Sequence, residues 1–356
     1  MMVERINRFV KHMVDQGFDG AFLTSRENKY YITGFNDEDG YALVTRYNVY
    51  LFVDARYYER VQKECPDVKV VLVERNLFDT IANAIELEEI KNLGIEEGNM
   101  TVSFYKKLTS KVECKVDGIN LLNIRAVKDE MELLYIRKAV SIADQTFKQV
   151  CKFIKPGMTE LEVKKFINDT MISLGAEKES FDTMVLSGKK GSMPHGVASK
   201  KKIESGDFVT MDYGAFYKGY ASDITRTIVV GPKVNNPKLK DVYDAVLNAN
   251  IKAIEAAKPG MLAKDLDKVA RDYLESRGYG KYFTHSLGHG IGVLIHDELG
   301  IHAYSDVKLE KNMVFTIEPG VYIPGVGGIR IEDDVVITET GCEVLTKSKK
   351  TLTFVK

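Results

Sequence analysis

The fold of this chain is decided by residues 285–332, which begin HSLGHGIGVLIHD and end FTIEPGVYIPGVGGIRIE. This stretch holds four of the six histidines of the chain, and it places Glu318 and Glu332 inside apolar runs that read as strands. Imidazole and carboxylate groups are costly to bury when they have no partner. The pattern therefore predicts a buried cation, for which a metal ion is the natural candidate.

Two segments of the C-terminal two thirds resemble each other. Each reads as a helix, the sequence Lys-Pro-Gly-Met, a second helix and a closing glycine. Lys-Pro-Gly-Met occupies residues 155–158 and again 258–261, and Gly175 and Gly278 repeat the same offset. Proline and glycine end the first helix of each pair. Chance similarity is the competing explanation, and the two shared offsets argue against it.

Each helix pair is followed by a β-rich stretch that carries two acidic residues. The first stretch holds Asp212 and Asp223, and the second holds Glu318 and Glu332. A glycine-containing turn separates the two acids in both stretches, which is typical of a β-hairpin. Two copies of such a unit would form halves that face each other across a pseudo-twofold axis. We therefore expect the four acids to converge at the seam between the halves.

These acids lie among mainly apolar residues, so we expect them to be buried. A buried carboxylate must be paired, protonated or bound to a metal. The basic residues close to them in sequence are Arg226 and Arg330, and two arginines do not easily neutralise four acids. Each acid alone could form a structural salt bridge, but the four together with the histidines favour a metal site.

His289 adds an imidazole to this set. It lies in SLGHGIG, where glycines on both sides let the backbone approach a ligand closely. Carboxylates with one imidazole suit divalent ions such as Mn²⁺, Co²⁺ or Zn²⁺. With two acids from each half, two ions could share bridging carboxylates and polarise a carbonyl oxygen, which is hydrolytic chemistry. The glycines lack the strand–loop–helix context of a phosphate or dinucleotide site.

The other histidines are weighed individually. We predict His296 and His195 as site residues and His285 as a further candidate, because imidazoles can donate hydrogen bonds to a carbonyl oxygen or a tetrahedral intermediate. The alternative for each is a structural histidine. His302 is expected to lie outside the catalytic machinery.

Arg330 is a candidate for orienting other groups. Arg330 and Glu332 are two residues apart in a predicted strand, so their side chains point to the same face. Arg330 could therefore orient a carboxylate ligand or the substrate. The alternative is an ordinary salt bridge to Asp333 or Asp334.

The N-terminal third reads as a small α/β domain without a catalytic constellation. Helical spacing of apolar residues predicts a helix over 3–16. Three runs read as strands, the last two paired around Asn48: NKYYITGF (28–35), YALVTRYN (41–48) and VYLFVDA (49–55). We place the domain boundary so that residues 1–123 form this domain and residues 124–356 form the C-terminal domain.

Composition excludes several classes of function. The formal net charge of −1 gives no basic field for nucleic acid. No apolar run approaches the ~18 residues needed to span a bilayer, and the charged N-terminus lacks the apolar core of a signal peptide. The four cysteines are far apart and fit thiols in a reducing cytosol. We therefore expect a cytoplasmic protein with no nucleic-acid or membrane partner.

Four motifs together resemble the metallopeptidase family of aminopeptidase P and prolidase: MDYGAFYKGYASDITRT, HSLGHGIGVLIHD, FTIEPGVYIPGVGGIRIEDD and MPHG. The N-terminal third is similar to the creatinase-like N-terminal domain of that family. The resemblance implies an α+β fold. Its C-terminal catalytic domain would be a pita-bread domain, a duplicated αα-β unit, beside the smaller α/β N-terminal domain.

The resemblance also implies a binding site for two divalent ions, Mn²⁺ first, with Co²⁺ or Zn²⁺ as alternatives. The implied ligands are Asp212, Asp223, His289, Glu318 and Glu332. Among these, Asp223 and Glu332 would bridge both ions, and Glu318 would also act as general base or proton shuttle. The histidines at 296 and 195 would contact the scissile carbonyl and the proline side of the substrate, with that at 285 close by. A homodimer is implied as well.

The implied reaction is hydrolysis of the Xaa-Pro bond at the N-terminus of a peptide, whose prolyl nitrogen carries no N–H. Prolidase, an Xaa-Pro dipeptidase, is the alternative to aminopeptidase P. Dipeptide-restricted members often place an arginine upstream of the TIEPG strand, but residues 299–314 contain none, which favours aminopeptidase P. A non-catalytic peptide-binding protein or a metal-free amidinohydrolase should have lost ligands, and this chain keeps all five.

Overall fold

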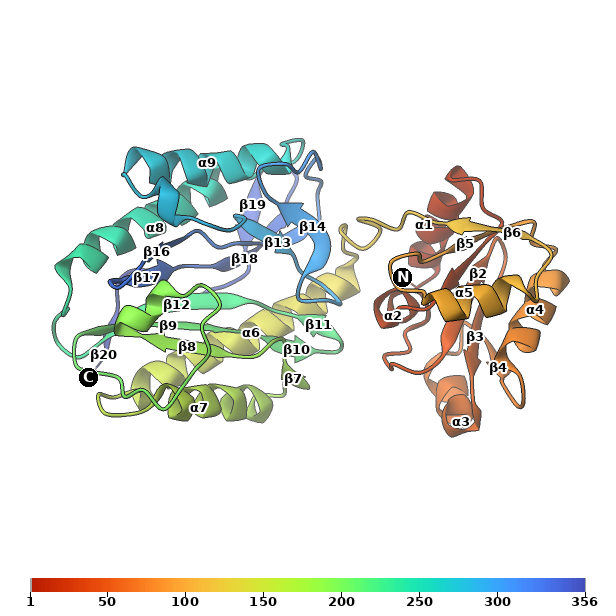
Figure 1. Ribbon diagram of the computed structural model, residues 1–356, viewed down its shortest axis with the longest axis horizontal. Coiled ribbons are helices and arrows are strands. Elements are labelled where there is room, and N and C mark those ends of the chain that lie inside the picture. The colour runs from red at the N-terminus through yellow and green to blue at the C-terminus, as the bar shows by residue number, and fades with distance from the viewer. Residues whose placement is uncertain (1, 356) are drawn as a thin grey trace. The chain divides into compact units, whose positions relative to one another are not determined.

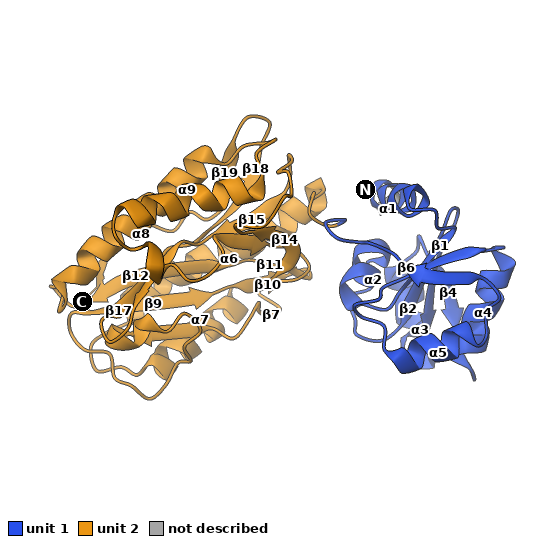
Figure 2. Cartoon of the chain, turned by 45° about the horizontal axis from the view of Figure 1, so that its top comes forward, with its two compact units in different colours: residues 1–124 blue, residues 125–356 orange. Residues whose placement is uncertain are grey.

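The computed structural model describes residues 2–355. The chain divides into two compact units, residues 1–124 and 125–356 (Figure 2). The predicted boundary, between residues 123 and 124, lies next to this division. No helix among the described residues is long and apolar enough to cross a membrane. The helices and strands are labelled in Figure 1, and each unit is described by itself.

A mixed sheet of six strands forms the centre of the N-terminal unit, in the order β4-β3-β2-β1-β5-β6. Its strands are β1 (Gly20–Leu23), β2 (Tyr41–Thr45), β3 (Val49–Val53), β4 (Lys69–Leu72), β5 (Asn92–Ile95) and β6 (Lys115–Gly118). Its helices are α1 (Met2–Asp15), α2 (Arg26–Thr33), α3 (Ala55–Glu64), α4 (Leu77–Leu87) and α5 (Val102–Thr109). The predicted hairpin around Asn48 is confirmed, because β2 and β3 pair antiparallel with Val44 opposite Val49.

The prediction of a strand over residues 28–35 is wrong, because α2 occupies most of this run. Ser25 caps the helix by accepting a hydrogen bond from the backbone N–H of Asn28. Gly34 ends it in the left-handed conformation with φ of 77°. Aromatic and β-branched residues such as Tyr31 and Ile32 favoured a strand. In the structure they belong to the helix and are buried. Capping residues at both ends outweighed β propensity.

The C-terminal unit contains two helix pairs and several small sheets. Its long helices are α6 (Glu130–Phe153), α7 (Glu160–Ser173), α8 (Pro237–Ala256) and α9 (Ala263–Ser276), and its short 3₁₀ helices are η1 (Gly188–Ser192) and η2 (Gly280–Tyr282). The strands of the first half are β7 (Lys178–Glu179), β8 (Met184–Ser187), β9 (Asp207–Tyr213), β10 (Ala215–Tyr217), β11 (Tyr220–Ala221) and β12 (Ile224–Val230). Those that follow are β13 (Gly288–Gly290), β14 (Asp297–Ile301), β15 (Val314–Ile317), β16 (Gly320–Ile323), β17 (Gly327–Arg330), β18 (Asp333–Ile337), β19 (Cys342–Val344) and β20 (Phe354–Val355).

The two halves of this unit repeat the same local structure. The Lys-Pro-Gly-Met turn of each helix pair contains a glycine with positive φ, 91° at Gly157 and 85° at Gly260. The N–H of Gly157 donates to the carbonyl of Ile203 at 2.8 Å, and that of Gly260 donates to the carbonyl of Leu309 at the same distance. Figure 1 shows one helix pair on each side of the strands. The predicted pita-bread architecture is confirmed.

Hairpins deliver the acids to the seam between the halves. Strands β9 and β12 pair antiparallel with Asp212 opposite Thr225. Strands β15 and β18 also pair antiparallel, in the order β14-β13-β15-β18-β19 of a five-stranded sheet. The backbone N–H of Glu332 donates to the carbonyl of Thr225 at 3.1 Å and so joins the two halves. The acids of one half therefore lie against those of the other.

Candidate metal centre and active site

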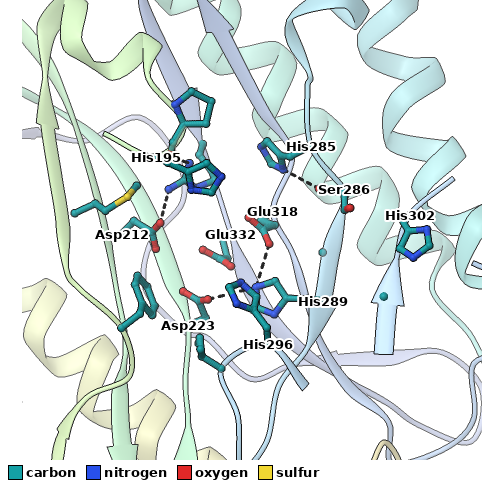
Figure 3. Close-up of a pocket in the computed structure, with 17 residues that line it drawn as sticks. His195, Asp212, Asp223, His285, Ser286, His289, His296, His302, Glu318 and Glu332 are labelled. Carbon is teal, nitrogen blue, oxygen red and sulfur yellow. Dashed lines mark hydrogen bonds and ion pairs between the residues drawn. The ribbon is translucent and has the colours of Figure 1, made fainter. Parts of the chain in front are cut away.

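The five predicted metal ligands come from both halves of the C-terminal unit and line one cavity of about 420 Å³ (Figure 3). Asp212 lies in β9, and Asp223 directly precedes β12. His289 is the middle residue of β13. Glu318 follows β15, and Glu332 lies between β17 and β18. The structure thus brings together residues that are widely separated in sequence.

Asp223, His289 and Glu332 form the tightest group, with one ligand atom of each within 4.8 Å of the others. The Nε2 atom of His289 lies 3.6 Å from Oδ2 of Asp223 and 3.3 Å from Oε1 of Glu318. Asp212 borders the same cavity without belonging to the tightest group. Four acidic side chains and one imidazole therefore surround a common space.

One ring nitrogen of His289 forms a hydrogen bond with the backbone, which leaves the other nitrogen available as a metal ligand. Its Nδ1 lies 3.1 Å from the carbonyl of Gly290, so Nδ1 carries the proton and donates it there. Burial lowers the pKa of His289, which keeps the ring neutral. The lone pair of Nε2 then faces the carboxylate oxygens of Asp223 and Glu318. Acceptors at these distances need a cation or a proton between them.

Three carboxylate oxygens at this place are buried without a hydrogen-bond partner among the described residues: Oδ1 of Asp212, Oδ1 of Asp223 and Oε1 of Glu332. The second oxygens of two of these groups are satisfied. Thr225 donates its hydroxyl to Oε2 of Glu332 at 2.6 Å, and Arg330 donates to Oδ2 of Asp212. Unpaired buried carboxylate oxygens are costly. Divalent cations would satisfy such oxygens, so the residues present fit a metal site.

Burial and the charges of neighbouring acids raise the pKa values of Asp223, Glu318 and Glu332. Burial raises the pKa of Asp223 well above its usual value, and the charge of Glu332 raises it further. Burial and the charge of Glu318 do the same to the pKa of Glu332. Burial raises the pKa of Glu318 to about 7. Such shifts are typical of carboxylates that share a site, and a bound cation favours their ionised forms.

Arg330 lies at the centre of a hydrogen-bond chain behind these acids. Its guanidinium donates to Asp212 and, at 2.7 Å, to the hydroxyl of Tyr322. It does not take the alternative partner Asp333, whose carboxylate pairs with Arg226 and Lys350, at 2.7 Å in each case. The side chain of Arg330 is thus placed to orient one of the predicted ligands.

His285 continues this chain. The hydroxyl of Tyr322 lies 3.0 Å from its Nε2, and its Nδ1 lies 2.8 Å from the carbonyl of Ser286. Burial lowers the pKa of His285 to about 4, and the charge of Arg330 contributes, so the ring is neutral. Its Nδ1–H donates to the carbonyl, and its Nε2 accepts from the tyrosine hydroxyl. Protein groups therefore occupy both nitrogens of this predicted site residue.

The three remaining histidines of interest also border the cavity. The ring of His296 packs edge-on against that of His289, with centroids 4.2 Å apart, and burial lowers the pKa of His296. His195 is exposed. His302, which we expected to lie outside the catalytic machinery, contributes to the wall of the cavity, and its ring lies over Gly300.

Several groups that support the site were not predicted from the sequence. Thr316 donates its hydroxyl to Oε1 of Glu318 at 3.1 Å and accepts the backbone N–H of His289 at 3.1 Å. Tyr322 could have been found from the register of the β16–β17 hairpin. In that hairpin Gly320 lies opposite Arg330 and Tyr322 opposite Gly328, which places the tyrosine on the same face as the arginine.

A cavity that gathers four acids and a histidine between two similar halves defines a metal-dependent hydrolase of duplicated architecture. Comparison with known families agrees. Residues 135–339 match the model of Metallopeptidase family M24, and residues 5–131 match the Creatinase/Prolidase N-terminal domain. The chain belongs to metallopeptidase family M24, as the resemblance of its motifs implied.

Individual relatives cover the whole chain. The Xaa-Pro dipeptidase of Pyrococcus furiosus is 42% identical over 355 residues, which are 99% of this chain and 100% of the relative. The solved structure of the Xaa-Pro dipeptidase from Bacillus anthracis is 39% identical, covers 100% of both chains and has a TM-score of 0.96. That of the X-Pro aminopeptidase from Thermotoga maritima MSB8 is 35% identical, covers 97% of this chain and 100% of its own, and has a TM-score of 0.89.

Proposed function

We propose that this chain is a metal-dependent exopeptidase that hydrolyses the bond between the first residue of a peptide and a following proline. The observation that carries the proposal is the set of three unpartnered, buried carboxylate oxygens on Asp212, Asp223 and Glu332, the last two of which group with His289. These atoms border a cavity whose volume suits a short peptide. The choice of an Xaa-Pro substrate is supported by relatives of both the dipeptidase and the aminopeptidase name.

We propose two divalent ions at this site, with Mn²⁺ as the first candidate. The residues that would hold them are Asp212, Asp223, His289, Glu318 and Glu332. When bound, the ions would supply Lewis acidity toward the scissile carbonyl and would activate water. Asp223 and Glu332 are the candidates for bridging, because each belongs to the tightest group of ligand atoms.

Glu318 is the candidate for moving protons during the reaction. Its carboxylate oxygen Oε1 lies 3.3 Å from Nε2 of His289, among the predicted ligands, and in the metal-free protein burial raises its pKa to about 7. The hydroxyl of Thr316 donates to Oε1 of this carboxylate and holds its orientation. His296 and His195, both on the cavity wall, are the candidates for hydrogen bonds to the substrate carbonyl.

The apolar part of the cavity fits a prolyl residue. Phe181, Met184 and Ile295 line the cavity together with the polar groups. A proline ring is apolar and its nitrogen has no N–H to satisfy. Such a wall therefore excludes water from the ring without leaving a donor unpaired.

Two candidates share this activity: a dipeptidase restricted to Xaa-Pro, which the names of several relatives support, and an aminopeptidase that takes longer Xaa-Pro peptides. The observation in favour of the aminopeptidase is the lack of arginine in residues 299–314, where dipeptide-restricted members of the family often place one. We further propose a cytoplasmic homodimer on the resemblance. Light scattering on the purified protein would give its mass in solution, and cell fractionation would give its location.

The proposal is tested by measuring release of the first residue from Xaa-Pro dipeptides, Xaa-Pro-Yaa tripeptides and Xaa-Ala dipeptides, with Mn²⁺ and with a chelator. We expect Mn²⁺-dependent cleavage of the proline peptides and little cleavage of the alanine peptide. No cleavage of either proline peptide by metal-loaded protein would refute the proposal. Preference between dipeptide and tripeptide decides between the two candidates.

A further inference from the structure

The imidazole of His302 lines the cavity and has no role in the proposed reaction. His302 lies one residue beyond β14, and its ring is folded back over Gly300 of that strand. A Cβ atom on residue 300 would lie 2.6 Å from Cδ2 and 2.7 Å from Nε2 of this ring. The imidazole therefore occupies the space that any side chain at residue 300 would take.

The hydrogen bonding of His302 fixes which nitrogen is the donor. The backbone N–H of Tyr304 donates to Nδ1 at 3.3 Å. Because Nδ1 accepts this hydrogen bond, the N–H of the ring is on Nε2, the nitrogen that lies over Gly300. Within residues 2–355, Nε2 has no hydrogen-bond partner. A donor on the wall of the cavity is thus left for a group from outside the chain.

The distribution of charge along the cavity indicates what this group is. The acidic residues on the cavity wall are the four acids of the seam, Asp212, Asp223, Glu318 and Glu332. Figure 3 shows His302 well apart from these acids. A free dipeptide has an ammonium group at one end and a carboxylate at the other. An anionic acceptor such as this carboxylate suits an N–H donor that lies away from the four acids.

We propose that His302 is a specificity-determining residue whose Nε2–H donates to the free carboxylate of an Xaa-Pro dipeptide. This inference rests on the proposed Xaa-Pro peptidase function. It gives the chain a carboxylate-binding donor within 299–314, the stretch that contains no arginine. Gly300 is required beside it, because a larger residue would displace the imidazole.

The test compares an Xaa-Pro dipeptide with the same dipeptide amidated at its C-terminus, using the metal-loaded full chain. His302→Ala should raise KM for the free acid about tenfold, the effect of one hydrogen bond to a charged group. It should leave kcat within about twofold and should not change KM for the amide. His302→Gln, which retains an N–H donor, should restore part of the lost affinity.

Two further variants serve as a second disturbance of the ring and as a control. Gly300→Ala should shift KM for the free acid in the same direction as His302→Ala, because it pushes the ring aside. His12→Ala makes the same substitution on α1, outside the cavity, and should change neither KM. Equal effects of His302→Ala on acid and amide, or no effect on either, would overturn the inference while Xaa-Pro cleavage by the unmodified chain persists. Failure of the unmodified chain on every proline peptide would instead refute the proposed function.

Discussion

Glu332 illustrates the constraint on single residues at this site. Its side chain is buried, one oxygen accepts the hydroxyl of Thr225, and the other has no partner among the described residues. Asp223 is in the same position, with one buried oxygen left unpaired. Neither arrangement is stable for an ionised carboxylate without a cation. Both residues should therefore be essential for metal binding.

We predict that Glu332→Gln and Asp223→Asn each lose bound metal and lower kcat by at least about a hundredfold. An amide keeps the shape of the side chain but is a much weaker metal ligand than a carboxylate. Metal content after gel filtration and kcat on an Xaa-Pro dipeptide are the two readouts. Asp182→Asn, which neutralises a largely exposed acid paired with Lys164, is the control and should change neither. Full activity and metal content in either site variant would remove that residue from the ligand set.

The ligands could be predicted from sequence because acids and a histidine in apolar runs are conspicuous. Hydroxyl groups could not, since a threonine or tyrosine in a strand is ordinary. Thr225 and Tyr322 acquire their roles only through the pairing of strands across the seam and within a hairpin. The place of His302 on the cavity wall could not be predicted for a similar reason, because it depends on the glycine two residues before it.

At the scale of elements, β14 is held by a buried ionic cluster. Asp297, its first residue, accepts from Nη2 of Arg125 at 2.6 Å and from Nζ of Lys128 at 3.2 Å. All three side chains are at most 3% exposed. Burial alone would raise the pKa of Asp297, but the charges of Lys128 and Arg125 hold it below its usual value. This cluster fixes the strand that directly follows His296.

We predict that Asp297→Asn lowers the free energy of unfolding by about 3 kcal/mol, because it removes the carboxylate that pairs with the buried Lys128 and leaves Arg125 with the more distant Glu298 at 3.5 Å. Urea denaturation of the metal-loaded protein measures this change. The matched control is Asp306→Asn, whose carboxylate is 79% exposed and pairs with Lys264. An exposed pair contributes at most about 1 kcal/mol, so the control should differ little from the unmodified chain. A loss below about 1 kcal/mol for Asp297→Asn would contradict the account.

Most elements follow from local patterns, but some depend on distant contacts. The repeated Lys-Pro-Gly-Met turns and the hairpins around the acids were predictable, since proline, glycine and alternation mark them directly. Helix α2 was missed because its aromatic residues resemble a strand, while Ser25 and Gly34 determine its ends. The cluster around Asp297 was not predictable, because its partners lie about 170 residues earlier in the chain.

For the whole molecule, the acids of the seam should make stability depend on metal and pH together. Burial raises the pKa of Glu318 to about 7 from a usual value of 4.5. At this side chain, the folded, metal-free protein therefore binds more protons than the unfolded chain between these pH values. Its stability from this group is complete below pH 4.5 and is lost as the pH rises through about 7.

We predict that Glu318→Gln removes this loss in chelated protein. The difference in Tm between the variant and the unmodified chain should increase in favour of the variant from pH 5 to pH 8. His285 has the opposite effect, because its lowered pKa makes stability fall as the pH drops below 6.5. Both proteins contain His285, so its effect cancels in the difference in Tm. Thermal unfolding in a chelator at several pH values measures it. A difference that is constant with pH would contradict the assigned pKa.

The two halves of the C-terminal unit have no complete site of their own. One contributes Asp212 and Asp223, and the other contributes His289, Glu318 and Glu332. The duplicated hydrogen bonds at Gly157 and Gly260 show that the halves are built alike, and the metal site arises where they meet.

The central claim is that this shared site, when loaded with metal, cleaves Xaa-Pro bonds. The most direct measurement is a titration of chelated protein with Mn²⁺ while proline release from an Xaa-Pro dipeptide is followed. We predict no release before metal is added and full activity once about two ions are bound per chain. Release that persists in the chelated protein, or its absence after two ions have bound, would contradict the claim.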